Sequence, residues 1–467
     1  MQLTCASHCP DYYCGVAHPN IVFVFSDQQR YGTIGCTGCS LIQTPSLDRL
    51  ADEGVLFRQA FSSCPICSPY RGQVLTGRYS HTNGVVDNEY RLFRNQVTLA
   101  QVLKAAGYRT AYVGKWHLGY GPYTAEQRYG FDYMAAYNCR HDYFSVDYWE
   151  NETGPHRLDQ WAPAGETDLA MRFIQSHHET DPNNPFFLMM SWGPPHWPYD
   201  QYPDEYRIYD PKDVEVPPNV PEQMEAFARR EIADYYGNST GLDAQMGRLL
   251  DCLERQGLRD NTVICYASDH GDHLSSHGYG KPGDTWLHHT KRASKATPHE
   301  EAIHVPFILS YPERVGARKQ TDVLFSSVDV MPTLLSLAEI DVPAVVHGRD
   351  LSHAALGGEG PEPDSVYLQI LGPGWPRRGD WVGFWRGLRT HRWVYARWLH
   401  NEDVWLFDRE NDPFEMTNLA GAPEYAEIQH RLDQRLRDWI DATEDPFETG
   451  DRDPTTGMLS LGQELTR

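Results

Sequence analysis

The chain has 467 residues and a formal net charge of −23, from 41 Lys and Arg against 64 Asp and Glu. This length is sufficient for one large and one smaller folding unit. The acidic balance excludes non-specific binding to nucleic acid or to an anionic membrane, so a polyanionic substrate requires a local basic pocket.

The apolar runs IVFVF (21–25) and FFLMM (186–190) are far shorter than the roughly 20 residues of a membrane-spanning helix. They therefore predict buried strands and no membrane segment. The N-terminal sequence lacks the basic and apolar regions of a secretory signal. We expect a cytoplasmic protein as the chain stands, or a periplasmic or secreted one if this is a trimmed mature form.

Strand and helix signals alternate along most of the chain, which predicts an α/β fold with a large, mostly parallel sheet flanked by helices. NIVFVFSD (20–27) is a continuous apolar run typical of a strand buried on both faces. TPSLDRLADEG (44–54) predicts a helix with a capping threonine, a proline in its first turn and a glycine stop. A second helix is predicted at 97–107, and further strands at 108–114, 185–192 and 261–269.

Four of the predicted strands end in polar sequence: SDQQR, GKWHLG, GPPHWPY and SDHGDH. Ligands bind at the carboxyl ends of the strands in open parallel sheets. We therefore expect these four segments to converge on one site.

A smaller unit is predicted at the C-terminus, with a boundary between residues 365 and 366. The segment 381–398 predicts two antiparallel strands, and 425–441 predicts a helix with apolar residues at spacing four. The sequence thus divides into a catalytic α/β domain (1–365) and a C-terminal α+β subdomain with an antiparallel sheet (366–467).

Cys64 and Cys67 in CPICSPYRG allow three interpretations. A C-x-x-C pair can be a redox motif. With Cys36 and Cys39 it can also form a zinc array, although the gap from residue 40 to residue 63 exceeds the roughly 15–20 residues usual in zinc ribbons. Alternatively, Cys67 is a nucleophile, because Pro69 favours a helix start at which free N–H groups stabilise an anion.

The third interpretation gains support from a family resemblance. Cys67-Ser-Pro-Tyr-Arg71, followed by LTGR (75–78), resembles the signature of type I, formylglycine-dependent sulfatases of the alkaline-phosphatase-like superfamily. The resemblance continues in order from about residue 19 to residue 420. It implies that a formylglycine-generating enzyme oxidises Cys67 to formylglycine, whose aldehyde hydrate is the nucleophile.

The loops Ser26-Asp27-Gln28 and Ser268-Asp269-His270 resemble the metal loops of that family. With the modified Cys67, the resemblance implies that Asp27, Gln28, Asp269 and His270 bind one divalent cation. Gln28 and His270 replace the commoner aspartate and asparagine, which lowers the negative charge of the site. Ca²⁺ is the expected ion, with Mn²⁺ as the alternative.

The other motifs resemble catalytic segments of the family: GKWHLG (114–119), PHWP (195–198) and KATPHEE (295–301). The resemblance implies that His196 or Lys295 protonates the leaving alcohol and that His117 takes a proton from the second hydroxyl of the hydrate. Further candidate substrate contacts are His299, where the family has tyrosine, and Arg386 in the C-terminal unit. The expected catalytic residues are Cys67, Arg71, Lys115, His117, His196 and Lys295, and Lys115, His196 and Lys295 are also expected to bind substrate.

The function implied is hydrolysis of a sulfate ester, of a sulfated mono- or oligosaccharide or of an aryl sulfate. Two alternatives remain: a formylglycine-dependent phosphonate monoester or phosphodiester hydrolase, and a non-catalytic binding or zinc-structured protein with unconverted Cys67. The segment 275–294, with His288, His289, Lys291 and Arg292, is either a substrate-recognition loop or a solvated surface loop. The sequence predicts no oligomeric state.

Overall fold

A ten-stranded sheet forms the centre of the molecule in the computed structural model, which describes residues 18–88, 90–278, 295–317, 319–372, 384–399 and 403–450. The strand order is β11-β2-β10-β9-β1-β8-β4-β5-β6-β7. The neighbours from β9 to β5 pair in parallel, whereas β10 and β6 pair antiparallel to both of their neighbours. The strands are β1 Asn20–Asp27, β2 Val55–Phe57, β4 Arg109–Lys115, β5 Tyr133–Tyr137, β6 Val146–Glu150, β7 Thr153–Leu158, β8 Phe186–Pro195, β9 Thr262–Ser268, β10 Phe307–Ser310 and β11 Lys319–Thr321.

The central strand β1 is buried on both faces, as its continuous apolar sequence predicts. Ile21, Phe23 and Phe25 belong to one apolar cluster, and Val22 and Val24 belong to the cluster on the opposite face. Successive side chains of a strand point to opposite faces, so this one run anchors both helical layers.

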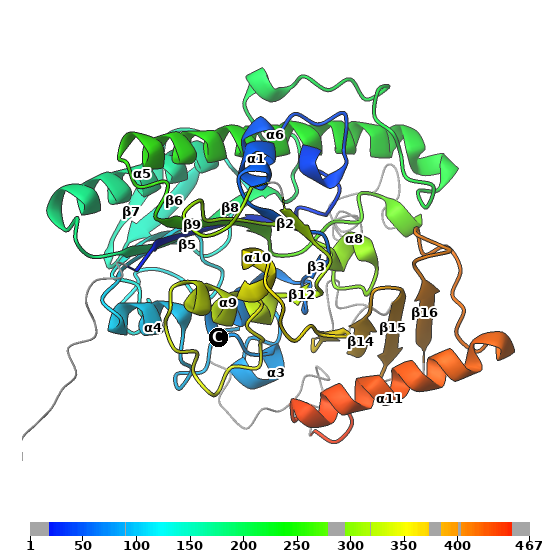
Figure 1. Cartoon of the computed structure of the whole chain (residues 1–467). Coiled ribbons are helices and arrows are strands. Elements are labelled where there is room, and N and C mark those ends of the chain that lie inside the picture. Colours follow the sequence, from blue (N-terminus) through cyan, green and yellow to red (C-terminus); the bar gives the residue numbers. More distant parts are fainter. Residues whose placement is uncertain are drawn as a thin grey trace, which may run out of the picture.

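Helices cover the two faces of the sheet (Figure 1). The longest, α6, packs with α5 against β8, and α4 packs against β4 from the other side. Thr98 and Gln101 form a capping box at the start of α4, and a proline begins α1. One layer contains α1 Pro45–Asp52, α5 Ala162–Thr180 and α6 Glu225–Arg255; the other contains α2 Cys67–Thr76, α3 Ser80–Asn83, α4 Leu99–Ala105, α9 Val330–Leu337 and α10 Ser352–Leu356.

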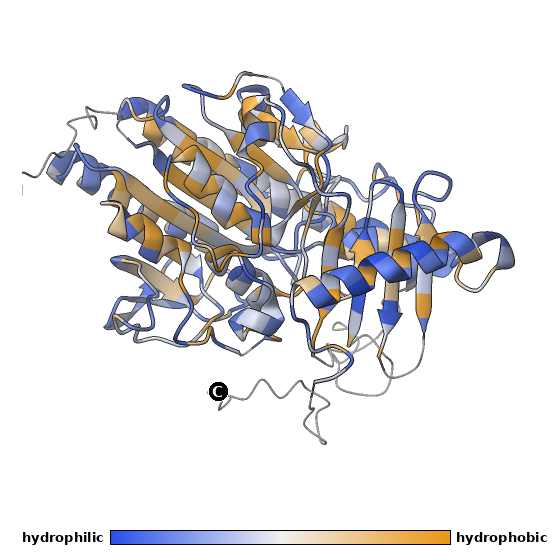
Figure 2. Ribbon diagram, turned by 60° about the horizontal axis from the view of Figure 1, so that its bottom comes forward, coloured by the Kyte–Doolittle hydropathy of each residue, from blue (hydrophilic) through white to orange (hydrophobic). Residues whose placement is uncertain are grey.

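The C-terminal unit is an antiparallel four-stranded sheet covered by one helix, as predicted. The strands are β13 Val366–Ile370, β14 Trp385–Arg389, β15 Trp393–Trp398 and β16 Val404–Asp408. Helix α11 (Ala426–Ala442) buries Leu432, Leu436 and Ile440 against the sheet and turns a hydrophilic face outward (Figure 2). Residues 381–383 of the predicted strand pair lie outside the described residues, and the division at residues 365 and 366 stays a prediction.

Two short strands, β3 (Ala60–Phe61) and β12 (Phe325–Ser326), form a separate pair beside the junction of the two units. At that junction, Cys64 and Ile66 pack in one apolar cluster with Leu368 and Trp385 of the C-terminal sheet. Trp385 Nε1 also donates to the carbonyl of Ala296 at 3.0 Å. The second sheet therefore supports the segments that precede residue 67 and follow residue 295.

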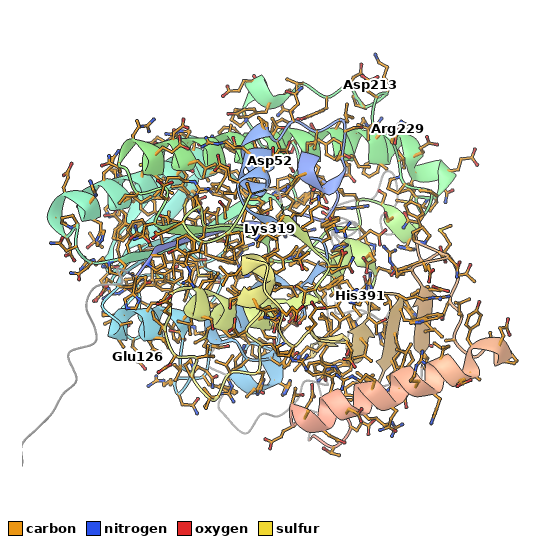
Figure 3. All side chains as sticks on the ribbon, in the orientation of Figure 1. Asp52, Glu126, Asp213, Arg229, Lys319 and His391 are labelled. Atoms are coloured by element: carbon orange, nitrogen blue, oxygen red, sulfur yellow. The ribbon has the colours of Figure 1, made fainter. Side chains whose placement is uncertain are left out.

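The negative charge of the chain lies largely on its surface. Asp52, Glu126 and Asp213 are exposed and point away from the core (Figure 3). No helix within the described part of the chain is long and apolar enough to cross a membrane.

Arg386 belongs to a buried ion pair, so the prediction that it contacts substrate is not supported. Its side chain is 1% exposed, and its Nε and Nη2 lie 2.7 and 2.9 Å from the carboxylate oxygens of Asp445. Nη1 donates to the carbonyl of Ile370 at 2.9 Å. These contacts join the start of β14, the end of β13 and the segment after α11.

Replacing Asp445 by Asn tests this pair. Burial raises the pKa of Asp445, but Arg386 and His81 outweigh it and lower the pKa to about 2. Because the folded pKa lies below the unfolded value of about 3.9, the wild type should lose about 2 kcal/mol of stability as the pH falls from about 5 to about 2. At neutral pH, Asp445→Asn should cost about 3–5 kcal/mol, since Arg386 is left buried without its counter-charge.

Denaturant unfolding of both proteins across this pH range measures the effect, and the variant should show the weaker acid dependence. Asp364→Asn is the control, because Asp364 is 68% exposed and pairs with Arg435 at the surface. Its cost should stay below about 1 kcal/mol. Equal costs for the two variants would contradict the structural role of the Arg386 pair.

Candidate active site

The carboxyl ends of the central parallel strands converge, as the polar segments predict. Asp27 ends β1, Lys115 ends β4 and Asp269 follows β9. Lys115 Nζ lies 2.6 Å from Asp27 Oδ2. All three side chains are buried, so their charges interact in surroundings of low dielectric constant.

Arg71 links two of these strand ends from helix α2. Its Nη2 lies 3.1 Å from Asp27 Oδ2 and 3.2 Å from Asp269 Oδ2. Its Nη1 donates to Ser191 Oγ on β8 at 2.7 Å. The guanidinium therefore fixes the position of α2 relative to β1, β8 and β9.

Cys67 is the first residue of α2 and is 1% exposed. Its Sγ lies 3.0 Å from Lys295 Nζ, 3.3 Å from His270 Nε2 and 4.0 Å from Lys115 Nζ. The N-cap residue, Ile66, has no side-chain oxygen to cap the free N–H groups of the first turn. Both the helix end and the two lysines favour an anion at this point.

The charges around Cys67 control its ionisation. Burial and Asp27 oppose the thiolate, but Lys115, Lys295 and His270 outweigh them and hold the pKa of Cys67 well below its ordinary value. Cys64, three residues earlier, has its pKa raised by burial. The two cysteines of the C-x-x-C segment thus differ in chemistry, as the nucleophile interpretation expects.

Cys36, Cys39 and Cys64 join no group of potential metal ligands within the described residues, and each is a free thiol. Cys64 is instead packed in the apolar junction with the C-terminal sheet. The zinc-array and redox interpretations therefore have no structural support.

The group Asp27, Cys67, Asp269 and His270 fits a divalent cation, because their ligand atoms all lie within 4.8 Å of one another. His270 Nδ1 lies 3.0 Å from the carbonyl of Gly271, which can only accept, so Nδ1 carries the proton. In the neutral ring, Nε2 then presents its lone pair 3.5 Å from Asp269 Oδ1. Gln28 Oε1 lies at the edge of this group and accepts from Lys295 Nζ at 3.1 Å.

The metal-loop backbone and the His117 backbone are held in unusual conformations. Gln28 and His117 have φ of 69° and 55°, in the left-handed region that non-glycine residues seldom adopt. Ser68 Oγ donates to the carbonyl of His117 at 2.6 Å, which ties GKWHLG to the residue after Cys67. Such conformations concentrate at functional sites, where the surrounding structure enforces them.

His196 follows β8 and is half-buried beside the charged group. Burial, Lys295 and His141 lower the pKa of His196 well below its ordinary value. Its Nδ1 lies 2.7 Å from the carbonyl of Trp197, which assigns the proton of the neutral ring to Nδ1. His196 is therefore neutral near pH 7 in the absence of a bound anion.

Sequence reasoning missed His141, which contacts His196, and Cys139, which contacts His141. The His141 ring stacks on His196 at 4.5 Å between centroids, and its Nε2 lies 3.4 Å from Cys139 Sγ. Burial opposes ionisation of Cys139, but Lys115, His117 and His141 lower its pKa to about 5. Both follow β5, the next parallel strand, so the strand-end rule could have identified them.

His299 is not brought into the Cys67 group. Its ring is buried, and Nδ1 lies 2.9 Å from Glu415 Oε2 of the C-terminal unit. The prediction that His299 contacts substrate is therefore not supported. Of the segment 275–294, residues 279–294, including the four basic candidates, lie outside the described residues.

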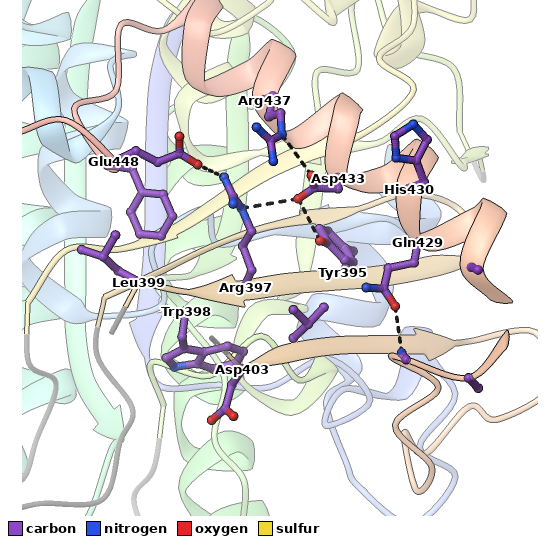
Figure 4. Close-up of a pocket in the computed structure, with 15 residues that line it drawn as sticks. Tyr395, Arg397, Trp398, Leu399, Asp403, Gln429, His430, Asp433, Arg437 and Glu448 are labelled. Carbon is purple, nitrogen blue, oxygen red and sulfur yellow. Dashed lines mark hydrogen bonds and ion pairs between the residues drawn. The ribbon is translucent and has the colours of Figure 1, made fainter. Parts of the chain in front are cut away.

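A separate surface pocket of about 580 Å³ lies between β15, β16 and α11 (Figure 4). Arg397 is 3.5 Å from Asp433 and also contacts Glu448, and Arg437 is 3.0 Å from Asp433. Its arginines are thus matched by carboxylates. The Cys67 group, where lysines surround a nucleophilic atom, is the better candidate for sulfate chemistry.

Comparison with known proteins agrees with this geometry. Residues 19–340 match the family model described as sulfatase. The chain belongs to the sulfatase family. It is accordingly a sulfuric ester hydrolase with the alkaline-phosphatase-like fold.

This sulfatase also matches, over residues 291–442, the model described as the C-terminal part of N-sulphoglucosamine sulphohydrolase. An ulvan-active sulfatase of Formosa agariphila is 33% identical, with 93% of this chain and 83% of the relative aligned. An N-acetylglucosamine-6-O-sulfatase of Bacteroides thetaiotaomicron is 27% identical, over 95% of this chain and 89% of the relative.

Two solved structures have the same fold as this sulfatase. One, from Bacteroides fragilis, is 31% identical with a TM-score of 0.81, covering 96% of this chain and 99% of its own. The other is a complex with its substrate D-glucosamine-2-N,6-O-disulfate and is 26% identical, with a TM-score of 0.81. That match covers 92% of this chain and 100% of the other.

Removing Arg71 should destabilise the sulfatase strongly. Arg71→Met leaves two buried carboxylates without their shared cation, and we expect a loss of about 3–5 kcal/mol. Urea unfolding in the presence of a chelator measures this loss. Arg157→Met is the control, because Arg157 is 54% exposed and pairs with Asp147 at the surface, so its cost should stay below about 1 kcal/mol. Equal effects would show that Arg71 does not hold the strand ends together.

Proposed function

We propose that this sulfatase hydrolyses sulfate esters of mono- or oligosaccharides, and also aryl sulfates, with residue 67 as the nucleophile after its conversion to formylglycine. One observation carries the proposal: Cys67 Sγ lies at a helix N-terminus, 3.0 and 4.0 Å from the ammonium groups of Lys295 and Lys115. A nucleophile that must attack an anionic sulfate ester needs this positive environment.

The aldehyde of formylglycine, as its hydrate, would supply one hydroxyl to attack sulfur and a second whose deprotonation lets sulfate leave. Asp27, Gln28, Asp269 and His270 would hold one divalent cation, Ca²⁺ or Mn²⁺, which would neutralise charge on a sulfate oxygen. The donor set supports this assignment, since carboxylate and amide oxygens suit either ion and imidazole favours Mn²⁺.

Lys115, Lys295 and Arg71 would bind and orient the sulfate. Burial increases the strength of their interactions; Asp27 and Asp269 hold Lys115 and Arg71 in place before substrate arrives, and Lys295 donates to Gln28 Oε1. Such preorganised charge stabilises a transition state without reorganisation during the reaction.

The proton transfers fall to the histidines and Lys295. His196 is neutral without substrate, and the negative charge of a bound sulfate ester would favour its protonation. His196 or Lys295 would then protonate the departing alcohol oxygen. His117, held beside residue 68 through its carbonyl, would accept the proton from the second hydroxyl.

The relatives support a saccharide substrate. One relative is an ulvan-active sulfatase, another is an N-acetylglucosamine-6-O-sulfatase, and one solved structure contains a disulfated glucosamine. Conversion of Cys67 would require a formylglycine-generating enzyme as a maturation partner. Because Cys67 is 1% exposed, that enzyme would act before the chain folds.

Replacing each cysteine of the C-x-x-C segment in turn tests which of the two is the nucleophile. Cys67→Ala should abolish turnover without loss of fold, since the side chain is small and its role is chemical. Cys64→Ala should retain most activity, because Cys64 lies in apolar packing. Kinetics, circular dichroism and the intact mass of the residue-67 peptide are the measurements, and conversion to formylglycine removes about 18 Da from the cysteine. An unconverted Cys67 in an active enzyme would refute the mechanism.

Substrate comparison tests the ester class. With equal concentrations of an aryl sulfate, an aryl phosphonate monoester and an aryl phosphodiester, kcat/KM should be highest for the sulfate. A panel of sulfated monosaccharides then identifies the ring position. A large preference for the phosphorus esters would favour the phosphonate or phosphodiester hydrolase instead.

A further inference from the structure

A second group of potential metal ligands lies apart from the Cys67 group, at the junction with the C-terminal subdomain. It contains His277, His299, Glu301 and Glu415, and one ligand atom of each lies within 4.8 Å of the others. His277 belongs to a 3-10 turn (Ser276–Gly278), and His299 is the N-cap of α8 (Glu300–Ile303). Glu415 lies in the loop after β16.

The side chains of this second group face one another in the interior. His299, Glu301 and Glu415 are buried, and the His277 side chain is 12% exposed. The rings of His277 and His299 stack at 3.8 Å between centroids, with 13° between their planes. His299 Nδ1 lies 2.9 Å from Glu415 Oε2, and His277 Nε2 lies 3.3 Å from Glu301 Oε2.

Asn219 uses both of its amide protons in other hydrogen bonds, so neither proton lies between His277 Nε2 and Glu301 Oε2. Asn219 Nδ2 lies 2.7 Å from Glu301 Oε1 and 3.2 Å from the carbonyl of Phe414, which together use its two protons. Its third close contact is His277 Nε2, at 3.1 Å. A lone pair on Nε2 would repel Glu301 Oε2 at 3.3 Å, so this contact requires either a hydrogen on Nε2 or a metal ion between the two atoms.

Glu415 provides an independent indication. Its side chain is 1% exposed, and among the described residues its Oε1 has no hydrogen-bond partner. Arg409 Nε is 4.0 Å from this oxygen, beyond hydrogen-bond distance. A buried carboxylate oxygen without a donor is costly, and coordination of an ion would satisfy it.

We propose that His277, His299, Glu301 and Glu415 bind a second metal ion, a divalent transition metal of the zinc class. Two imidazole nitrogens and two carboxylate oxygens provide the four ligands that zinc takes in structural sites, whereas calcium prefers oxygen alone. The carboxylates also have outer partners of the kind that orient ligands: Asn219 donates to Glu301, and the Glu300 N–H donates to Glu415 Oε2 at 3.1 Å.

The ion would join the two units of the chain. Glu415 comes from the C-terminal subdomain, and the other three ligands come from the catalytic domain. Three of the four ligands are buried, and all four belong to a different group from the nucleophile, so the role is structural. His299 stands where the family resemblance predicts a tyrosine, so the family pattern does not predict this ligand.

Zinc binding under calcium saturation tests the proposal. The full-length protein is stripped with a chelator, loaded with excess CaCl₂ to occupy the first site, and titrated with ZnCl₂ by calorimetry; bound zinc is then counted by elemental analysis. We expect one zinc per chain. Glu415→Gln and His277→Ala should each weaken zinc binding at least 100-fold and remove the zinc-dependent rise in Tm.

Two control variants make the result specific. Glu410→Gln removes an exposed carboxylate of the same loop, 66% exposed and paired with Arg392, and should bind zinc as the wild type does. His270→Ala removes a ligand of the first group and should also retain the zinc. If circular dichroism shows that Glu415→Gln does not fold, the test rests on His277→Ala. The His277 side chain is partly exposed, so its removal should not prevent folding.

Absence of zinc binding by the calcium-loaded wild type would overturn the proposal. So would unchanged zinc affinity in both Glu415→Gln and His277→Ala. Loss of the zinc in His270→Ala alone would place the ion in the first group and would equally overturn it. In each of these cases a protonated His277 paired with Glu301 would explain the contacts.

Discussion

The buried guanidinium of Arg71 is the interaction on which the rest of the site depends. It lies between Asp27 and Asp269, which end two adjacent strands, and each of these charges would be costly alone in a dry interior. Burial of these charges is favourable only when Arg71 lies between Asp27 and Asp269, and this requirement fixes the position of α2 relative to the sheet. That position places Cys67 between Lys295 and Lys115, and Asp27, one of the two carboxylates, also holds Lys115 at 2.6 Å.

The C-terminal sheet extends this constraint to both sides of the nucleophile. Ile66 precedes Cys67, Ala296 follows Lys295, and both contact the cluster that contains Trp385. Burial of this apolar surface stabilises the two short loops that present the reactive groups. The second unit therefore fixes the backbone on both sides of the candidate nucleophile, and its buried Arg386 pairs with Asp445.

The sequence predicted those features that depend on local pattern. The strands at 20–27 and 261–269 are continuous apolar runs, and the strand-end rule brought Asp27, Lys115 and Asp269 together correctly. Pairs such as Arg386 with Asp445 and His299 with Glu415 are 59 and 116 residues apart and follow no period. Strand β6 and the edge strand β7 were missed because they are short and partly exposed, and because Gly154 and Pro155 interrupt the pattern of β7.

The acidic surface and the cationic site act on a substrate at different distances. Arg71, Lys115 and Lys295 act at contact distance, whereas the surface carboxylates act on molecules that approach. At physiological salt the surface field is screened beyond about 8 Å, so a small sulfated saccharide feels little repulsion before it reaches the site. Much of the length of a long polyanion, in contrast, would lie within this screening distance of the surface carboxylates. From this charge distribution we propose short saccharides as the preferred substrates over intact polymers.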